Sequence, residues 1–444
     1  MLCDNFREMY RRKLMTPEQA VKAIRSGTTM VTPLGNGEPP AIMEALGQWI
    51  LAGGVENLHL ISGLQVTAGT LYTPQVFEKG ITIDSIYVGP VVRQWVQQGL
   101  CTYTPNHLSE VSSFTWRIHD NVETVAYTVS PMDKHGFFTT GTHCDYAWEV
   151  WKRSPAARNL IVEVNENMPR THGNNSFHIS EVTAVVENNR PLTTISAPEP
   201  SKEDETIAAY IADCIPDEAC IQLGIGAIPN AVAKFLGNKR DLGVHSEMLT
   251  DSMVDLYRQG VITCEKKNYF YSKIIGAFAF GSKKLYDFLD DNTMVQLYPT
   301  RFVNDPNVSG RNNKLISINA TMEVDLTGQC ASETVAHLQY TGTGGQVDFV
   351  RGTWRSKGGK SFLACYSTYI DHDGQLQSKI LPMLKAGAVV TTPRTDVQNV
   401  VTEYGIAELK GQSIAERVKR LIAVAHPDFR DWLMFEAKRL YYLA

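Results

Sequence analysis

The sequence predicts two related α/β domains with mainly parallel sheets, and three observations lead to this fold class. The chain has 444 residues, more than one hydrophobic core usually spans. Residues 219–248 show the pattern of a strand, a glycine loop, a helix and a second strand, which is the unit of a parallel sheet. The same order of elements occurs near residue 20 and again near residue 210. Two copies of one architecture are the interpretation we favour over a chance similarity of common βαβ units.

Composition narrows the class of protein. A hydrophobic share of 43% and a charged share of 20% are those of a soluble globular protein. A formal net charge of -5 argues against nucleic acid or an anionic membrane as the main partner, although a local basic pocket remains compatible with it. Residues 1–14 carry charges throughout and have no apolar signal-peptide core, and no run reaches membrane-spanning length. We therefore expect a cytoplasmic protein.

The eight cysteines are scattered along the chain and form no Cys-x-x-Cys pair. No combination of cysteine and histidine has the spacing of a zinc site. We expect reduced, buried cysteines and no metal centre.

The first domain is expected to span residues 1–190. Thr16 and Pro17 have the positions of a helix cap and a first helical residue. A short strand at 30–34, a loop at 35–40, a helix at 41–51 and a strand at 57–63 follow, and two further buried strands are predicted at 125–129 and 160–164.

A polar stretch rich in proline predicts an extended linker at 191–205, so the second domain is expected at 206–444. It opens with a helix at 206–213 and a strand at 219–223. The loop 224–229 then leads into a helix at 230–235, with Pro229 in the first turn. A second strand at 242–245 delivers Glu247, and a helix is predicted at 251–259. Two later strands, 315–318 and 362–365, complete the domain.

The carboxyl ends of these strands are where parallel α/β sheets bind ligands. Gly224, Gly226 and Glu247 would lie at that edge, and Asn165 and Asn319 also follow predicted strands. These asparagines either line a face used for chemistry or bond the backbone of local turns, and the sequence favours neither interpretation.

Glu247 is the strongest candidate for chemistry. A single glutamate at a strand end is usually a surface cap or an ion-pair partner. Here it follows a glycine loop whose amides face the same edge, and a carboxylate in that setting can act as general base, metal ligand or nucleophile. No companion residues with metal-ligand spacing are visible. Backbone amides stabilise a developing oxyanion, so a base or nucleophile for acyl chemistry fits best.

Two glycine motifs resemble nucleotide-binding patterns without matching them. The stretch Gly224-x-Gly226-x-x-Pro229 has proline where the dinucleotide fingerprint needs its third glycine, which makes NAD a minor alternative. Residues 356–361 end like a phosphate-binding loop, but the first glycine is missing and a strand follows. This stretch is still basic, and Lys357 and Lys360 with nearby arginines either hold phosphates or belong to a solvated turn.

Taken together, these motifs and their order along the chain resemble those of the acetyl-CoA hydrolase/transferase family of coenzyme A transferases. The sequence is most similar to the branch with 4-hydroxybutyrate, butyryl-CoA:acetate and itaconate CoA-transferases. Matching stretches run nearly end to end, at 130–136, 163–165, 224–226, 245–248, 319, 342–349, 356–361, 403–409 and 425–430. Relatives often have glycine where this chain has Ala227, a change that would trim the pocket beside the loop.

The resemblance implies a family I CoA-transferase fold of the NagB/RpiA-like type with the active site between the domains. It implies Glu247 as nucleophile, supported by Asn319, with an oxyanion hole formed by backbone amides near Ile225 and Gly345. The wider oxyanion and CoA-binding set would comprise Gly224, Ile225, Gly226, Gly344, Gly345, Gln346, Lys357 and Lys360. Met30, Gly35, Asn36 and Gly37 occupy the corresponding place in the first domain, so we expect them on the acyl-pocket side.

The expected partners are acyl-CoA and short-chain carboxylates, with coenzyme A as substrate and no permanently bound cofactor. We also expect no nucleic acid, no membrane and a homo-oligomer. The function favoured is transfer of coenzyme A through a glutamyl-CoA thioester. An acyl-CoA hydrolase using the same glutamate, a nicotinamide oxidoreductase and a non-catalytic CoA-binding module remain as alternatives.

Overall fold

The structure is a computed structural model that describes residues 6–196, 199–224 and 226–444. The chain divides into two compact units. Unit 1 comprises residues 1–195 and 275–303, and unit 2 comprises residues 196–274 and 304–444. Both units have parallel strands connected by helices, so the prediction of two α/β domains is confirmed.

The central sheet of unit 1 has the strand order β10-β7-β5-β1-β2-β3-β4, and every neighbouring pair is parallel. Its strands are β1 (Thr29–Leu34), β2 (His59–Gly63), β3 (Thr82–Ser85), β4 (Thr102–Tyr103), β5 (Val122–Val129), β7 (Asn159–Val164) and β10 (Ala184–Glu187). Other strands of unit 1 lie outside this sheet, namely β6 (Phe137–Thr139), β8 (His172–Gly173), β9 (Ser176–His178), β13 (Ile274–Ala279) and β14 (Val295–Leu297).

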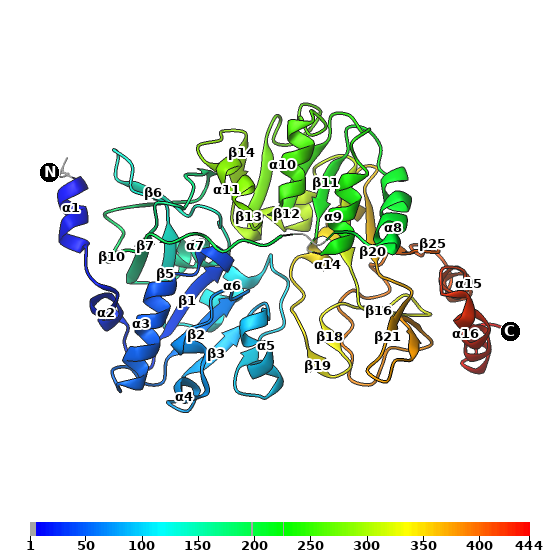
Figure 1. Cartoon of the computed structure of the whole chain (residues 1–444), viewed down its shortest axis with the longest axis horizontal. Coiled ribbons are helices and arrows are strands. Elements are labelled where there is room, and N and C mark those ends of the chain that lie inside the picture. The colour runs from blue at the N-terminus through cyan, green and yellow to red at the C-terminus, as the bar shows by residue number, and fades with distance from the viewer. Residues whose placement is uncertain (1–5, 197–198, 225) are drawn as a thin grey trace. The chain divides into compact units, whose positions relative to one another are not determined.

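Two helices of unit 1 were predicted, and both begin close to the expected residue (Figure 1). Thr16 caps α2, as expected, in a full capping box with Gln19, and proline starts α3. The helices are α1 (Phe6–Lys13), α2 (Pro17–Ala20), α3 (Pro40–Leu51), α4 (Pro74–Phe77), α5 (Pro90–Gln97), α6 (Val111–Ile118), α7 (Tyr146–Arg153), α11 (Lys283–Leu289) and α12 (Thr300–Val303).

Residues 275–303 were expected in the second domain, but they pack with unit 1. Backbone hydrogen bonds account for this placement. The Ala279 N–H donates to Thr142, the Asp291 N–H donates to Arg170, and the Ile195 N–H donates to Gly281. The linker region therefore continues unit 1 as far as residue 195.

In unit 2 the strands follow the order β25-β24-β20-β15-β11-β12, in which β24 and β25 are antiparallel and the other neighbouring pairs are parallel. They are β11 (Cys220–Leu223), β12 (Gly243–Leu249), β15 (Leu315–Ala320), β20 (Lys360–Ala364), β24 (Asn399–Thr402) and β25 (Gly405–Glu408). Smaller pairings involve β16 (Glu323–Asp325), β17 (Cys330–Ala331), β18 (Thr334–Val335), β19 (Leu338–Gln339), β21 (Thr368–Ile370), β22 (Leu376–Ser378) and β23 (Ile380–Leu381).

The helices of unit 2 are α8 (Lys202–Asp213), α9 (Ala227–Lys234), α10 (Asp251–Arg258), α13 (Pro306–Ser309), α14 (Gln346–Arg355), α15 (Ile414–Ala423) and α16 (Pro427–Arg439). Pro229 lies in the first turn of α9, as expected. Strand β12 runs two residues beyond Glu247, so the glutamate lies within the strand instead of after it. No helix in the described part of the chain is long and apolar enough to cross a bilayer.

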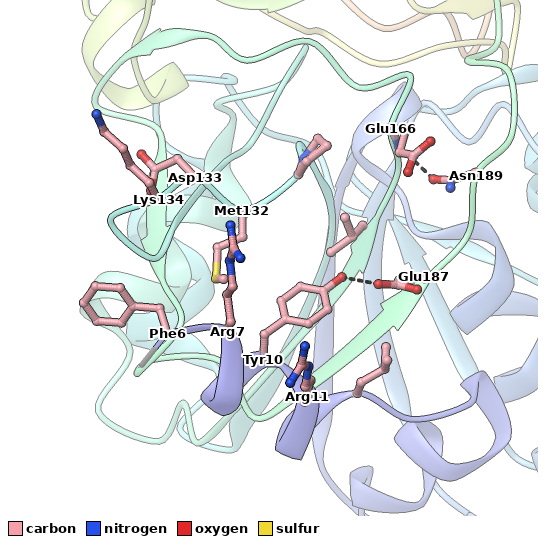
Figure 2. A pocket seen from close by; sticks show the side chains of 13 residues that line it. Phe6, Arg7, Tyr10, Arg11, Met132, Asp133, Lys134, Glu166, Glu187 and Asn189 are labelled. Atoms are coloured by element: carbon pink, nitrogen blue, oxygen red, sulfur yellow. Dashed lines mark hydrogen bonds between the residues drawn. The ribbon is translucent and has the colours of Figure 1, made fainter. Parts of the chain in front are cut away.

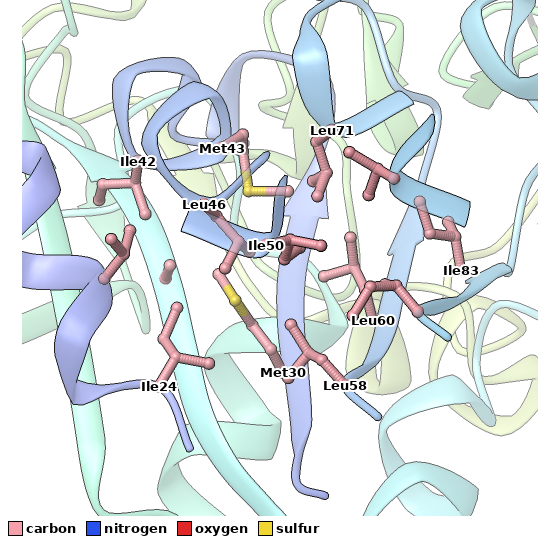
Figure 3. Close-up of a cluster of buried hydrophobic side chains, with 14 of the residues drawn as sticks. Ile24, Met30, Ile42, Met43, Leu46, Ile50, Leu58, Leu60, Leu71 and Ile83 are labelled. Atoms are coloured by element: carbon pink, nitrogen blue, oxygen red, sulfur yellow. The ribbon is translucent and has the colours of Figure 1, made fainter. Parts of the chain in front are cut away.

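Met30 lies inside a hydrophobic cluster of unit 1, which Figure 3 shows. Its side chain is fully buried among residues of α3 and β2, including Ile42, Leu46 and Leu60. These surroundings are those of a core residue. The expected role of Met30 at the acyl pocket stays a prediction, and a packing role is what its position favours.

Replacing Met30 with alanine should lower the free energy of unfolding by about 2–5 kcal/mol, because the variant leaves a cavity in a packed core. Chemical denaturation followed by circular dichroism would measure this loss. Met383→Ala is the matched control, since Met383 is 54% exposed. Equal, small effects of the two substitutions would show that Met30 does not have a core role.

Candidate active site

Glu247 lies on β12 and keeps partial solvent exposure, as a nucleophile that meets a substrate must. One oxygen of its carboxylate, Oε2, accepts a hydrogen bond of 2.6 Å from the Asn304 side-chain amide. The backbone N–H of Gly345 also hydrogen-bonds to this carboxylate. Two donors from distant parts of the sequence therefore hold Glu247 in one orientation.

Gly345 must be glycine because of how closely it approaches Glu247. A Cβ atom built at this position would lie 1.9 Å from Glu247 Oε2 and 2.2 Å from Asn304 Nδ2. Gly345 is also the N-cap of α14, so the carboxylate lies where a helix amino end presents N–H groups and positive potential. The local backbone is thus arranged to receive negative charge.

The pKa of Glu247 is raised to about 7, mainly because burial disfavours the charged form. The hydrogen bonds from Asn304 and Gly345 oppose this shift and only partly offset it. The folded-state pKa therefore exceeds the reference value of 4.5. The contribution of Glu247 to stability is complete below that reference value and is lost as pH rises through about 7.

Asn304 was not predicted from the sequence. It is fully buried and directly precedes Asp305, whose side chain caps α13. The only sequence signal here is Asp305-Pro306, which indicates a helix start and says nothing about a partner 57 positions away on β12. A contact between two residues so far apart in sequence can be identified only from the folded structure.

Asn319, the asparagine that was predicted, bonds elsewhere. Its Nδ2 donates to Ser317 at 2.9 Å and to Gln222 at 3.2 Å, and its Oδ1 accepts from Gln222. All three side chains are buried, and together they join the carboxyl ends of β11 and β15. Asn319 therefore orders the strand ends beside the loop 224–229, while Asn304 contacts the nucleophile candidate. A catalytic role of Asn319 stays a prediction.

The predicted oxyanion residues lie in two loops of unit 2. The Gly224 N–H already donates to the Ile318 carbonyl at 2.8 Å, and Gly226 starts α9 with φ of 128°. Ile225, the expected donor of this loop, lies outside the described residues. In the second loop, Gly344 precedes Gly345. The side chain of Gln346 is buried and bonds Ser332, Thr392 and Ala320, so it anchors α14.

Lys357 and Lys360 lie at the other edge of the same sheet. Lys360 starts β20 and pairs with Ile316 near the amino end of β15, whereas Asn319 is near its carboxyl end. A strand advances about 3.3 Å per residue, so the length of β15 separates these lysines from the strand ends beside Gly224. Their expected contact with CoA phosphates stays a prediction that this geometry does not favour.

The other residues expected at the acyl pocket lie in the turn of unit 1 at 35–37, which is a short 3₁₀ helix. The Asn36 side chain donates to the Thr193 carbonyl and the Tyr286 hydroxyl, and it accepts from the Thr193 N–H. Gly35 and Gly37 are buried on either side of it. These contacts hold the turn against the segment around Thr193. An acyl-pocket role for the turn stays a prediction.

A cavity of about 740 Å³ in unit 1 involves none of the predicted site residues (Figure 2). It lies between α1, the turn 131–134 and the ends of β7 and β10. Tyr10 donates to Glu187 there, and Asp133 is paired with Arg170. Basic and acidic side chains line it in equal number, namely Arg7, Arg11 and Lys134 against Asp133, Glu166 and Glu187. The lining therefore indicates no ligand charge, and we assign this cavity no function.

Comparison with known proteins places this site in a family. Residues 2–196 match the acetyl-CoA hydrolase/transferase N-terminal domain, and residues 281–437 match the corresponding C-terminal domain. A succinyl-CoA:cyclohexane-1-carboxylate CoA transferase from Geobacter metallireducens is 39% identical over 440 residues, which is 98% of this chain and 97% of the relative. A 4-hydroxybutyrate coenzyme A transferase from Clostridium kluyveri is 40% identical over 436 residues, or 97% and 99% of the two chains.

Solved structures agree. The crystal structure of RipA from Yersinia pestis has a TM-score of 0.91 and 37% sequence identity, covering 99% of this chain and 100% of that one. Both domain matches, near-complete relatives and a full-length structural match thus lead to one assignment. The chain belongs to the acetyl-CoA hydrolase/transferase family, as an enzyme of the coenzyme A transferase class.

Proposed function

We propose that this enzyme moves coenzyme A from a short-chain acyl-CoA to a carboxylic acid through a glutamyl-CoA thioester on Glu247. The observation that carries the proposal is the carboxylate of Glu247 held by Asn304 and Gly345 at the amino end of α14. A fixed, partly desolvated carboxylate has the geometry and the basicity of a nucleophile. Coenzyme A enters as a substrate.

In the first half of the cycle, a Glu247 oxygen attacks the thioester carbonyl, and the oxyanion that forms is stabilised by N–H donors such as that of Gly345. The C–S bond breaks, which releases the CoA thiolate and leaves an acyl-glutamyl anhydride. The thiolate then attacks the glutamyl carbonyl, and the donor's acyl group departs as a carboxylate. The product is a thioester between Glu247 and coenzyme A.

The second half reverses these steps with a new acid. The acceptor carboxylate attacks the glutamyl thioester, the CoA thiolate leaves, and a mixed anhydride forms again. The thiolate attacks the acceptor's acyl carbonyl, and Glu247 departs as a free carboxylate. One thioester replaces another, so the exchange needs no net input of energy. Splitting it into steps of similar difficulty is the advantage of covalent catalysis.

The names of the relatives suggest the substrates to test first. Succinate, cyclohexane-1-carboxylate, 4-hydroxybutyrate and acetate should be compared as acceptors with the matching acyl-CoA donors. Hydrolysis by the same glutamate is the second candidate, since the partial exposure of Glu247 leaves it within reach of water. An acyl-CoA consumption rate independent of added carboxylate would favour the hydrolase.

Incubation with acyl-CoA alone should leave coenzyme A on Glu247, because the second half of the cycle then lacks its acceptor. Peptide mass spectrometry should locate the adduct on the peptide containing Glu247. Glu247→Gln keeps the size of the side chain and removes the anionic oxygen, so it should fold and form no adduct. Full transferase activity in freshly purified Glu247→Gln would refute the nucleophile assignment.

Gly345→Ala should fold but lose on the order of a hundredfold or more in kcat, because its Cβ would displace Glu247 and Asn304 from their present geometry. Steady-state kinetics and a thermal melt would measure the two effects. Gly237→Ala is the matched control, since its Cβ would meet nothing closer than 3.5 Å. Nearly normal turnover in Gly345→Ala would mean that the contact with Glu247 is not needed.

The value of kcat/KM for the acyl-CoA donor should rise with pH and level off above an apparent pKa near 7, because only ionised Glu247 attacks. Asn304→Ala removes a hydrogen bond that lowers this pKa, so its profile should move to higher pH. Initial rates across buffers of constant ionic strength would test both statements. A profile that stays flat from pH 5 to 9, or that moves to lower pH in Asn304→Ala, would contradict them.

A further inference from the structure

Glu333 is a buried acid with no part in the chemistry described above. It lies between β17 and β18 and is 3% exposed. Its carboxylate accepts hydrogen bonds from the Thr343 hydroxyl at 3.2 Å, the Thr391 hydroxyl at 3.0 Å and the Gln339 side-chain amide at 3.4 Å. Burying a carboxylate is costly, and several donors must converge on it to offset that cost.

These bonds attach Glu333 to the segment 341–345, which we call the glycine loop. The main-chain carbonyl of Glu333 accepts from the N–H groups of Tyr340 and Thr341, at 2.8 and 3.1 Å. Its carboxylate then reaches Thr343, two residues before Gly345. Glu333 therefore contacts both the start and the middle of the loop that supplies the Gly345 N–H to Glu247.

The composition of the glycine loop makes such an attachment necessary. Three of its five residues are glycines, which have no side chain to pack and keep the greatest backbone freedom. Thr343 is the side chain between them, and Glu333 accepts from its hydroxyl. On the far side of the loop, Gln346 bonds Ser332, Thr392 and Ala320. The loop is thus anchored before and after Gly345.

We propose that Glu333 is a positioning residue that acts through Thr343 to keep the Gly345 N–H directed at Glu247. This inference rests on the proposed function, because it assigns Glu333 to formation of the glutamyl-CoA thioester. Loss of the bond leaves the substrate-binding surfaces unchanged and lets the loop depart from the geometry that the attack requires. The consequence is a lower kcat with a nearly unchanged KM for acyl-CoA.

The test compares Thr343→Val, which removes the hydroxyl at constant size, with Thr343→Ser, which keeps it. Single-turnover formation of the Glu247 adduct, followed by rapid quenching and mass spectrometry, should slow about ten- to a hundredfold in Thr343→Val. Thr343→Ser should restore most of the rate. Glu333→Gln should slow the same step, and adding it to Thr343→Val should cost less than the sum of the two, because both break one bond.

Thr402→Val is the control for a general loss of stability. Thr402 is a fully buried threonine of unit 2 whose hydroxyl donates to Val424 and accepts from the Tyr404 N–H. It should lower the melting temperature at least as much as Thr343→Val while adduct formation stays fast. Adduct rates that follow melting temperature across all variants, or a normal rate in Thr343→Val, would overturn the inference alone. Absence of the adduct in the wild-type enzyme would overturn the proposed function as well.

Discussion

The contact between Glu247 and Gly345 is the constraint on which the site depends. A backbone N–H can meet the carboxylate this closely only because no Cβ stands between them. Because Gly345 has no side chain, it makes no side-chain contact that could fix the conformation of its own loop. Much of the surrounding polar structure in unit 2, from Glu333 to Gln346, can be understood as the means of holding that backbone in place.

The electrostatics of Glu247 follow from opposing demands. A nucleophilic carboxylate gains basicity when it loses water, and burial raises its pKa to about 7. More extensive burial would raise the pKa further and keep the Glu247 carboxyl group protonated and unreactive at neutral pH. Asn304 and Gly345 oppose the shift by donating to the charged form. The balance leaves a group that ionises near neutrality, within the range where covalent and acid–base catalysts work best.

Much of the fold could be predicted because its signals are local. The strand, loop and helix at 219–235 are determined by the hydrophobic pattern, by Pro229 in a first turn and by glycine at a helix start. The structure has each of these features. The same holds for Thr16 at α2 and for the helix that follows the turn at 35–37. The inclusion of residues 275–303 in unit 1 could not be predicted. Strand pairing between residues more than a hundred positions apart gives no signal in local composition.

The residues of the site likewise differ in whether a local sequence signal identifies them. Glu247 was recognisable from its strand and from the family resemblance, whereas Asn304, which donates to its carboxylate, was not predicted. Asn319 lies near the carboxyl end of a buried strand and so fits the general rule for ligand sites, whereas Asn304 precedes a short helix whose only evident feature is its cap. The predicted CoA-binding role of Lys357 and Lys360 rested on a different kind of signal. Closeness in sequence to the glycine loop suggested a shared site, yet α14 carries the chain from the carboxyl edge of the sheet back to its amino edge before the lysines appear. In an α/β unit a helix and the strand after it lead to opposite edges, so basic residues that follow such a helix cannot be assigned to the site at its start from spacing alone.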